Sequence, residues 1–298
     1  MDGWTPLLRG ELLLTANVLF GLFLGEILLR LGLAERLLGR FLPGLERLGI
    51  GPVVATALAT SLGSSRAGAA LLAAAHQEGR LSDRKVLWGT LSLAFPGYLR
   101  RWLTTVTLAT SLAGRTGTLF AVIILLRSFL RFLLTLILMG RSAEESAAER
   151  VPSHRPSRGL YRRIVVTLPW AWAFYALAHT AVPHLEQFLT ELLGGGFLLP
   201  PAGWTITAAG FGHLSASLAA AGASLSLGDL SGNEALFALL LGNSLGLVTR
   251  ALRQNAAFWF GLFPKKLAQR ILFCHFATTT PLSLITLVAA ALPLLIGR

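Results

Sequence analysis

The sequence predicts an all-α integral membrane protein made of two inverted-topology repeats, each with membrane helices, a re-entrant helical hairpin and a broken helix. Three observations lead to this fold class. The 298-residue chain is 54% hydrophobic and 13% charged, with a mean hydropathy of +0.65, whereas soluble domains carry about 25% charged residues. The stretch from Pro52 to Arg101 recurs 149 positions later as Pro201 to Arg250. Both copies contain small-residue breaks within apolar runs.

The two copies align without a gap and share seven identities outside Ala and Leu. These residues set backbone shape or carry polarity, so an internal duplication explains them better than an apolar composition does. The offset is half the chain length, and we therefore predict two repeat domains, 1–149 and 150–298. The seven pairs are Pro52/Pro201, Thr56/Thr205, Gly63/Gly212, Gly79/Gly228, Ser82/Ser231, Gly97/Gly246 and Arg101/Arg250.

Hydropathy and charge divide the first half into five segments and a linker. The first apolar run is long enough to cross the ~30 Å hydrocarbon core, and the alternation of apolar and charged residues after it predicts an interfacial amphipathic helix. A hairpin with a Gly-Ser-Ser turn, a segment broken at Pro96–Gly97, a further span and a polar linker follow. The ranges are Glu11–Leu31, Leu33–Leu48, Pro52–His76, Lys85–Leu112, Thr116–Gly140 and Arg141–Arg163.

The second half repeats this order, but the loops on either side of its hairpin contain no Lys or Arg. Its hairpin turns at Gly212 and its broken segment is interrupted at Gly246. The ranges are Ile164–Val182, Pro183–Leu193, a hairpin that ends at Leu227, Glu234–Leu262 and Leu267–Ile296.

Charge placement indicates that the hairpin Pro52–His76 does not cross the membrane. If it crossed, the basic loops Arg30–Arg47 and Arg80–Lys85 would lie on opposite sides, which the positive-inside rule disfavours. A re-entrant hairpin places both loops, and the linker Arg141–Arg163, in the cytoplasm. We therefore predict a multi-pass protein of the inner (plasma) membrane, with three crossings per half and both termini outside.

Arg80–Arg101 (RLSDRKVLWGTLSLAFPGYLRR) and Asp229–Arg250 (DLSGNEALFALLLGNSLGLVTR) share Leu-Ser, a polar pair, an apolar run, a small-residue break and a terminal Arg. This pattern resembles the nucleoside recognition (Gate) domain family of membrane proteins. The family includes the gate of ferrous-iron transporter B, spore maturation proteins A and B, and parts of concentrative nucleoside transporters. The resemblance implies a transport-type helical bundle with hairpins. Iron is not the substrate we expect, because Cys274 is the single cysteine and there is no GTPase domain.

The two hairpin turns supply the first candidate binding residues. A half-helix N-terminus near the midplane attracts anions through its free N–H groups and positive dipole end. Ser64 and Ser65 are good N-caps, and Arg66 follows in a first turn where a cation is favourable if an anion is bound. The structural alternative is that Arg66 snorkels to the interface and His213 bonds a carbonyl. The candidates are Gly63, Ser64, Ser65, Arg66, Gly212, His213 and Ser215.

Four further candidates lie near the predicted breaks. Arg101 follows the break of the first half, and Asn243, Ser244 and Arg250 flank the break of the second half. Charged residues at membrane depth are costly and are functional candidates by default, although an Arg that donates to carbonyls freed by a helix break is the structural alternative.

Other polar residues in the apolar segments have plainer interpretations. A buried pair of Glu26 with Arg127 is a structural explanation for the Arg in that span. The group of His179, His184 and Glu186 has loose metal-ligand spacing but lies at a span end, so we predict no metal site.

The leading functional prediction is a membrane transporter or facilitator for a small solute, bound between the two hairpins near the bilayer midplane. The surplus of intramembrane Arg over acidic residues favours an anionic solute. A non-transporting membrane scaffold or partner protein and a nucleoside transporter are the alternatives.

No nucleophile elbow, phosphate loop or paired-carboxylate motif occurs, so we predict no enzymatic activity and no cofactor. The basic residues are scattered between apolar spans, so nucleic acid is not an expected partner. The lipid bilayer and a small solute are the expected partners, and a homo-oligomer stays open. A single cysteine excludes an internal disulfide bond.

The topology can be tested by labelling single cysteines introduced at Arg80, Arg155 and Gly228. We expect an impermeant thiol reagent to reach positions 80 and 155 from the cytoplasm and position 228 from outside, because the hairpin re-enters. Labelling of positions 80 and 228 from the same side would contradict the prediction of inverted repeats.

Overall fold

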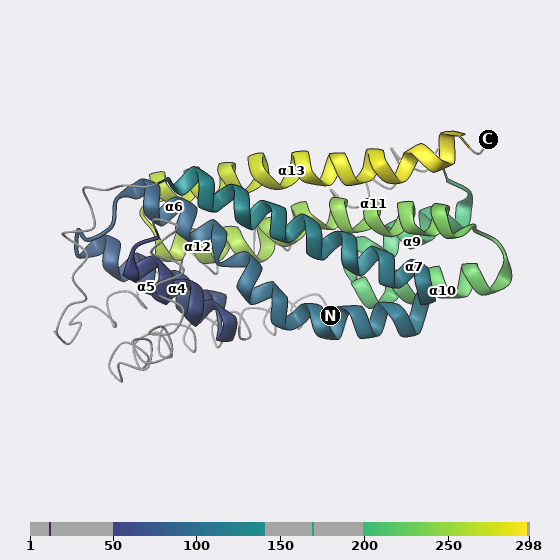
Figure 1. Cartoon of the computed structure of the whole chain (residues 1–298), viewed down its shortest axis with the longest axis horizontal. Helices are drawn as coiled ribbons and strands as arrows, with labels where there is room; N and C mark the ends of the chain where they lie inside the picture. The colour runs from purple at the N-terminus through teal and green to yellow at the C-terminus, as the bar shows by residue number, and fades with distance from the viewer. Residues whose placement is uncertain (1–11, 13–49, 141–168, 170–198, 297–298) are drawn as a thin grey trace, which may run out of the picture. The chain divides into compact units, whose positions relative to one another are not determined.

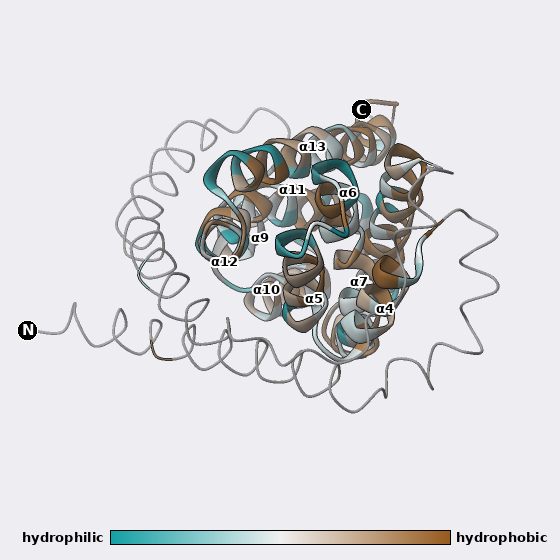
Figure 2. Cartoon of the chain, turned by 90° about the vertical axis from the view of Figure 1, so that its left-hand side faces the viewer, coloured by the Kyte–Doolittle hydropathy of each residue, from teal (hydrophilic) through white to brown (hydrophobic). Residues whose placement is uncertain are grey.

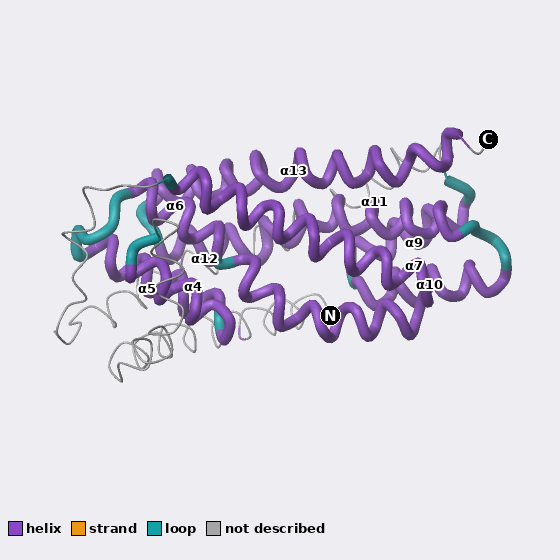
Figure 3. The backbone as a smooth tube through the Cα atoms, in the orientation of Figure 1, coloured by secondary structure: helices purple, strands orange, loops and turns teal. Residues whose placement is uncertain are grey.

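The computed structural model describes residues 12, 50–140, 169 and 199–296, and every element in these ranges is a helix (Figure 1, Figure 3). The prediction of an all-α chain is therefore confirmed for this part of the protein. Five predicted segments lie almost entirely outside the described residues, namely Glu11–Leu31, Leu33–Leu48, Arg141–Arg163, Ile164–Val182 and Pro183–Leu193.

The chain forms two compact units, each assembled from separate stretches. Within the described ranges, unit 1 comprises 50–100, 130–140 and 256–275, and unit 2 comprises 101–129, 199–255 and 276–296. Each unit thus contains one pair of short helices in the predicted hairpin region, together with parts of the long helices.

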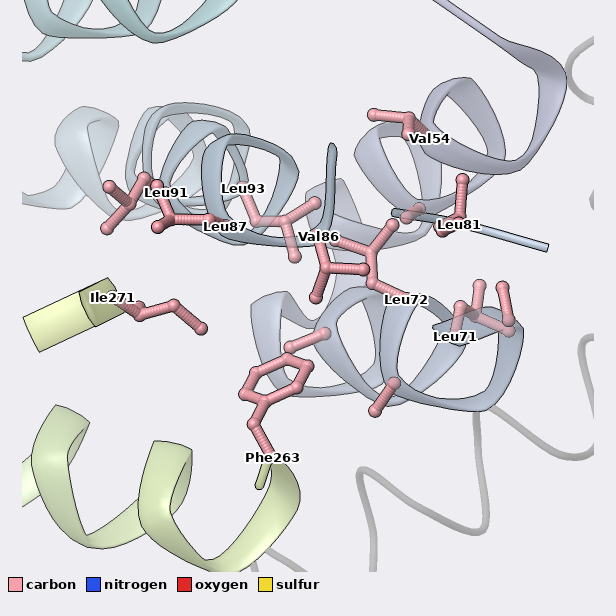
Figure 4. Packing of buried hydrophobic residues seen from close by; sticks show 14 of the residues in the cluster. Val54, Leu71, Leu72, Leu81, Val86, Leu87, Leu91, Leu93, Phe263 and Ile271 are labelled. Carbon is pink, nitrogen blue, oxygen red and sulfur yellow. The ribbon is translucent and has the colours of Figure 1, made fainter. Parts of the chain in front are cut away.

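Unit 1 begins with α4 (Pro52–Gly63), α5 (Ser65–Gln77) and α6 (Asp83–Ser92). Pro52 suits the first turn of α4 because its missing N–H has no intrahelical partner there. Aliphatic side chains from these helices pack with Phe263 and Ile271 into one apolar core (Figure 4). Burial of such side chains is the main favourable contribution to packing.

Polar contacts between helix ends lie at one end of unit 1. Arg84 Nη2 donates to Leu138 O at 2.9 Å. The Asp83 carboxylate lies 2.7 Å from His76 Nε2 and 3.9 Å from Arg270 Nη1. Exposed pairs of this kind contribute little stability, but they show that the α5–α6 connection, the end of α7 and the start of α13 lie together.

Helix α7 (Ala94–Met139) folds back on itself as a helical hairpin (Figure 1). Its turn is at Gly114, whose φ of 56° and ψ of −135° lie in a region that favours glycine. The two legs are antiparallel, because Trp102 Nε1 donates to Ala121 O at 2.9 Å and Thr110 Oγ1 lies 2.9 Å from Thr118 Oγ1.

Unit 2 contains α9 (Pro201–Gly212), α10 (Leu214–Leu227) and α11 (Gly232–Arg250). Helices α9 and α11 approach closely at two glycines: a Cβ atom added at Gly242 would lie 2.7 Å from Thr207 O, and one added at Gly210 would lie 2.9 Å from Gly242 Cα. The Thr207 hydroxyl also donates to Ala238 O at 3.3 Å. Small residues permit this backbone contact, as in other membrane helix pairs.

After α11 the chain continues through the π-helix η2 (Ala251–Ala256), α12 (Ala257–Leu262) and α13 (Lys265–Ile296). Three helical stretches of the described chain are long and apolar enough to cross a membrane: Arg101–Met139, which includes the turn at Gly114, Gly232–Leu262 and Lys265–Ile296. Their apolar character appears as brown turns in Figure 2. These helices are consistent with an all-α membrane protein.

The two predicted breaks in the long segments are wrong in position. The first interruption falls at Leu93, between α6 and α7, and not at Pro96–Gly97. Proline removes the amide that would bond the carbonyl four residues earlier, here that of Ser92, and its ring clashes with that carbonyl. Helix α6 therefore ends at Ser92, one turn before Pro96.

The break predicted at Gly246 does not exist, because α11 runs through this residue to Arg250. A glycine inside a helix costs about 1 kcal/mol relative to alanine but does not end it, and the apolar neighbours of Gly246 sustain the helix. The irregularity comes later, in the π-helix Ala251–Ala256.

We expect Gly242→Ala to lower the melting temperature of the purified protein in detergent. The added methyl group meets the backbone of Thr207 at 2.7 Å, and overpacking of this kind costs about 1–3 kcal/mol. Gly63→Ala is the matched control, because a Cβ atom there has nothing within 4 Å. Equal melting temperatures for the two variants would show that the α9–α11 contact is not tight.

Candidate functional site

The first helix break lies between α4 and α5. Helix α4 ends at Gly63, and Ser64 has an extended backbone with φ −153° and ψ 112°. The Ser64 side chain accepts a hydrogen bond from Ala67 N at 3.2 Å. Ser64 is therefore the N-cap of α5, as the sequence predicted.

The next residue, Ser65, connects this break to the start of α7. Its hydroxyl donates to Leu93 O at 3.4 Å, a carbonyl at the interruption between α6 and α7. A Cβ atom at Gly97 would lie 3.3 Å from Ser61 O and would collide with Ser65 Oγ. The absence of a side chain at Gly97 thus allows α7 to lie against the break between α4 and α5.

Arg66 is half-buried in the first turn of α5, and its guanidinium carbon lies 5.6 Å from the centre of the Phe258 ring. An arginine over an aromatic face gains a cation–π attraction that strengthens as water is excluded. The structure thus gives Arg66 an aromatic neighbour on α12, which neither sequence interpretation included.

The second break lies between α9 and α10 in unit 2. Gly212 ends α9 and His213 is extended, with φ −143° and ψ 125°. The His213 side chain is exposed and makes no capping hydrogen bond, and Ser215 is also exposed. The second turn therefore has the backbone of the first without its hydroxyl cap.

Gly246 lies against the residues just before the second break as Gly97 lies against those before the first. A Cβ atom at Gly246 would be 2.9 Å from Gly210 O. Gly210 and Gly246 stand 149 positions after Ser61 and Gly97, so the same backbone contact occurs at corresponding positions in both units.

Two of the predicted residues bind each other on α11. Arg250 Nη2 donates to Asn243 O at 2.9 Å and to Asn243 Oδ1 at 2.8 Å. Within the described part of the chain, Asn243 Nδ2 is buried without a hydrogen-bond partner. This amide is a donor that a bound acceptor would satisfy.

Ser244 belongs to a second polar group of unit 2, centred on Arg127. This arginine is only 6% exposed, and its Nη1 donates to Ser283 Oγ at 3.2 Å and to Ser244 Oγ at 3.5 Å. Ser283 is a residue that sequence reasoning missed, although a serine in an apolar span is a recognisable signal. Glu26, the partner predicted for Arg127, lies outside the described residues.

Sequence reasoning also missed His275 on α13. Its ring is 6% exposed, and its Nδ1 lies 2.9 Å from Arg131 Nη2 of α7. Trp259 of α12 contacts the ring edge-on, with ring centres 5.3 Å apart. A histidine within an apolar segment could have marked this position as a candidate in the sequence.

The remaining predicted residue, Arg101, is exposed on the first leg of α7. Within the described residues, Arg101 forms no hydrogen bond with Arg250, Asn243 or Ser244, although all four lie in unit 2. The candidate residues therefore form separate groups: Ser64, Ser65 and Arg66 at one break, Asn243 with Arg250, and Ser244 with Arg127.

Among the residues that the structure describes, no three His, Cys, Asp or Glu side chains are close enough to hold a metal ion. His179, His184 and Glu186 lie outside those residues. The described candidate groups contain guanidinium groups, hydroxyls and a side-chain amide on apolar helices, all of which can donate hydrogen bonds.

The fold and these polar groups define the chain as an all-α protein with the helices of a membrane protein. The uncharacterized protein MJ0871 of Methanocaldococcus jannaschii is 22% identical to it over 277 residues, which cover 88% of this chain and 87% of that protein. No family model matches the chain, and no solved structure matches it. The similarity extends over nearly the whole of both proteins.

We expect Arg250→Met to lower the melting temperature, because it leaves the Asn243 Oδ1 atom without its donor. A buried acceptor that loses its donor costs about 1–3 kcal/mol. The double variant Asn243→Leu/Arg250→Met removes both partners and should recover most of this loss, whereas Arg101→Met, at an exposed position, should change little. If Arg250→Met melts like the parent protein, the hydrogen bonds to Asn243 contribute no stability.

Proposed function

We propose that the protein is a membrane transporter or facilitator for a small anionic solute. The observation that carries the proposal is a helix–break–helix motif that occurs twice, at Ser64 and at His213, each time packed on a glycine of another helix. Irregular backbone within a membrane persists only where it is buried in protein or lines a cavity, and paired broken helices are typical of secondary transporters.

Local geometry supports the view that the two halves are repeats. Besides the breaks, Ser82 and Ser231 precede their helices with φ and ψ of −71°, 157° and −73°, 160°. Gly79 and Gly228 have φ of 72° and 77°. All of these pairs are 149 positions apart. We propose that the pairs α4–α5 and α9–α10 are re-entrant hairpins of inverted-topology repeats.

The polar end of unit 1 supports the proposed orientation. At this end, Arg84 near the start of α6 donates to Leu138 O near the end of α7, and Arg270 in the second turn of α13 lies 3.9 Å from the Asp83 carboxylate. Basic connections gather on the cytoplasmic side of membrane proteins. We therefore propose that this end of unit 1 faces the cytoplasm of the inner membrane and that both termini lie outside.

The charges of the apolar helices support an anionic solute. The three candidate spans contain nine Arg or Lys residues and one acidic residue, Glu234, whose carboxylate accepts from Ser231 N at 2.8 Å in a capping box. Arginine is also the side chain best suited to carboxylate and phosphate geometry. The cations are Arg101, Arg115, Arg127, Arg131, Arg250, Arg253, Lys265, Lys266 and Arg270.

The test combines ligand stabilisation and uptake with the full-length protein. We expect sulfate, phosphate or acetate to raise the melting temperature with increasing concentration. At a concentration of about 100 times Kd, the gain in the free energy of unfolding should be about 2.7 kcal/mol. The same anion should enter proteoliposomes. Uridine and magnesium should do neither, because they lack the negative charge that the guanidinium groups attract.

The variant Arg66→Gln should weaken the anion effect, since it keeps the size of the side chain but removes its charge. Arg115→Gln, at an exposed position beside the α7 turn, is the matched control and should respond like the parent protein. Stabilisation and uptake of uridine alone would favour the nucleoside transporter. Absence of uptake for every solute would favour the non-transporting scaffold.

A further inference from the structure

The first turns of α13 carry a group of exposed cations where the chain enters an apolar span. Lys265 and Lys266 are the first two residues of the helix, and Arg270 follows one turn later. All three residues are exposed, and the Arg270 side chain is 69% accessible. Because Lys265–Ile296 is long and apolar enough to cross a membrane, these charges stand at one end of a candidate span.

Helical periodicity gathers the exposed residues of this end on one side of α13. At about 100° per residue, five exposed positions fall within an arc of about 140°, and three buried positions fall on the opposite side. The buried residues pack in the apolar core of unit 1. The exposed ones, here called the basic face, are Lys265, Lys266, Gln269, Arg270 and Phe273, and the buried ones are Leu267, Ala268 and Ile271.

Phe273 continues the basic face into the apolar part of the helix. It is 73% exposed and lies eight positions after Lys265, roughly 12 Å along the helix axis. An exposed aromatic ring is unfavourable in water, but at this depth below the charges it reaches the acyl chains of a bilayer. The face thus presents charges first and hydrocarbon next, which is the order of polarity in a phospholipid.

The two lysines form no ion pair within the part of the chain that the structure describes. Asp83 of α6 lies 3.9 Å from Arg270 Nη1 and 2.7 Å from His76 Nε2, so one carboxylate serves the third cation and a histidine. The ammonium groups of Lys265 and Lys266 are therefore available to an anion in their surroundings.

The cations of the basic face are not a feature that the two halves share. The second leg of α7 stands 149 positions earlier and has Thr116, Gly117 and Ala121 in place of the three cations. Its one cation between residues 115 and 121 is Arg115, against three cations between residues 264 and 270. The arrangement of helices thus does not require these charges, and they point to a role of their own.

We propose that the basic face of α13 binds an anionic phospholipid, with the headgroup phosphate beside Lys265 and Lys266 and an acyl chain along Phe273. Basic segments at a membrane surface gain about fivefold in affinity for anionic lipid with each Lys or Arg, so two lysines give about 25-fold over a lipid without net charge. The inference concerns a lipid partner and does not depend on the solute of the proposed function.

The experiment compares two lipids with the same acyl chains, phosphatidylglycerol and phosphatidylcholine. Native mass spectrometry of the full-length protein in a non-ionic detergent counts the lipid molecules bound at each concentration. We expect phosphatidylglycerol to bind more tightly than phosphatidylcholine. The difference should shrink when the salt concentration is raised, because salt screens exposed charges. Equal binding of both lipids overturns the proposal.

The double variant Lys265→Gln/Lys266→Gln should bind phosphatidylglycerol about 25-fold more weakly and phosphatidylcholine unchanged. Lys265→Arg/Lys266→Arg keeps both charges and should bind like the parent protein. The matched control Arg101→Gln/Arg115→Gln removes the same charge from exposed positions of unit 2 and should retain the binding. Melting temperatures check that each variant is folded. If the control loses as much affinity as the lysine variant, the lipid responds to net charge and the proposal fails.

The variant Phe273→Trp reports where the lipid lies. After subtraction of the parent signal, its fluorescence should be quenched more by phosphatidylglycerol with brominated acyl chains than by brominated phosphatidylcholine at the same mole fraction. The excess should vanish when Lys265→Gln/Lys266→Gln is added. Equal quenching by the two lipids would mean that the anionic lipid lies elsewhere, which contradicts the proposal.

Free anions distinguish a lipid site from a site for soluble anions. Glycerol phosphate has the headgroup chemistry without acyl chains, so it should compete with phosphatidylglycerol only weakly. Competition by glycerol phosphate or inorganic phosphate at the concentration of the lipid would overturn the lipid proposal. Uptake measurements test the proposed function separately. Lipid binding without solute uptake leaves this inference standing, whereas uptake without any preference for phosphatidylglycerol removes it.

Discussion

The structure depends on close backbone contact at the points where helices are interrupted. A helix that stops inside an apolar chain leaves amide and carbonyl groups that need partners. Here the interruptions at Ser64 and His213 lie against Gly97 and Gly246, and in both cases the glycine faces the carbonyl three residues before the break. A side chain larger than hydrogen at either glycine would separate the two backbones.

Within this framework, three arginines of the apolar helices have different kinds of neighbour. Arg66 lies over the ring of Phe258, Arg127 donates to serine hydroxyls, and Arg131 donates to His275. Each contact joins residues that are far apart in the sequence. The partners that the described structure gives these arginines are thus an aromatic ring, hydroxyl groups and an imidazole.

The resemblance to the nucleoside recognition (Gate) family stays a prediction, since no family model matches the chain. What the resemblance implies about the fold, a helical bundle with hairpins, agrees with the pairs α4–α5 and α9–α10 as far as helices are concerned. The relative from Methanocaldococcus jannaschii matches nearly the whole chain, so the sequence similarity is not confined to one motif.

The sequence by itself determined the helical class, the hairpin breaks at Ser64 and His213 and the cap of α5, because apolar composition, Pro52 and Ser64 act on the few residues around them. The breaks predicted in the long segments were wrong. Pro96 interrupts the helix one turn earlier, after Ser92, and α11 continues through Gly246 to Arg250. Only the tertiary structure decided that Arg131 meets His275, that Arg127 meets Ser283, and that Arg101 remains exposed. Those outcomes depend on which faces of α7, α11 and α13 pack together, and helical periodicity within a single segment does not specify its partner.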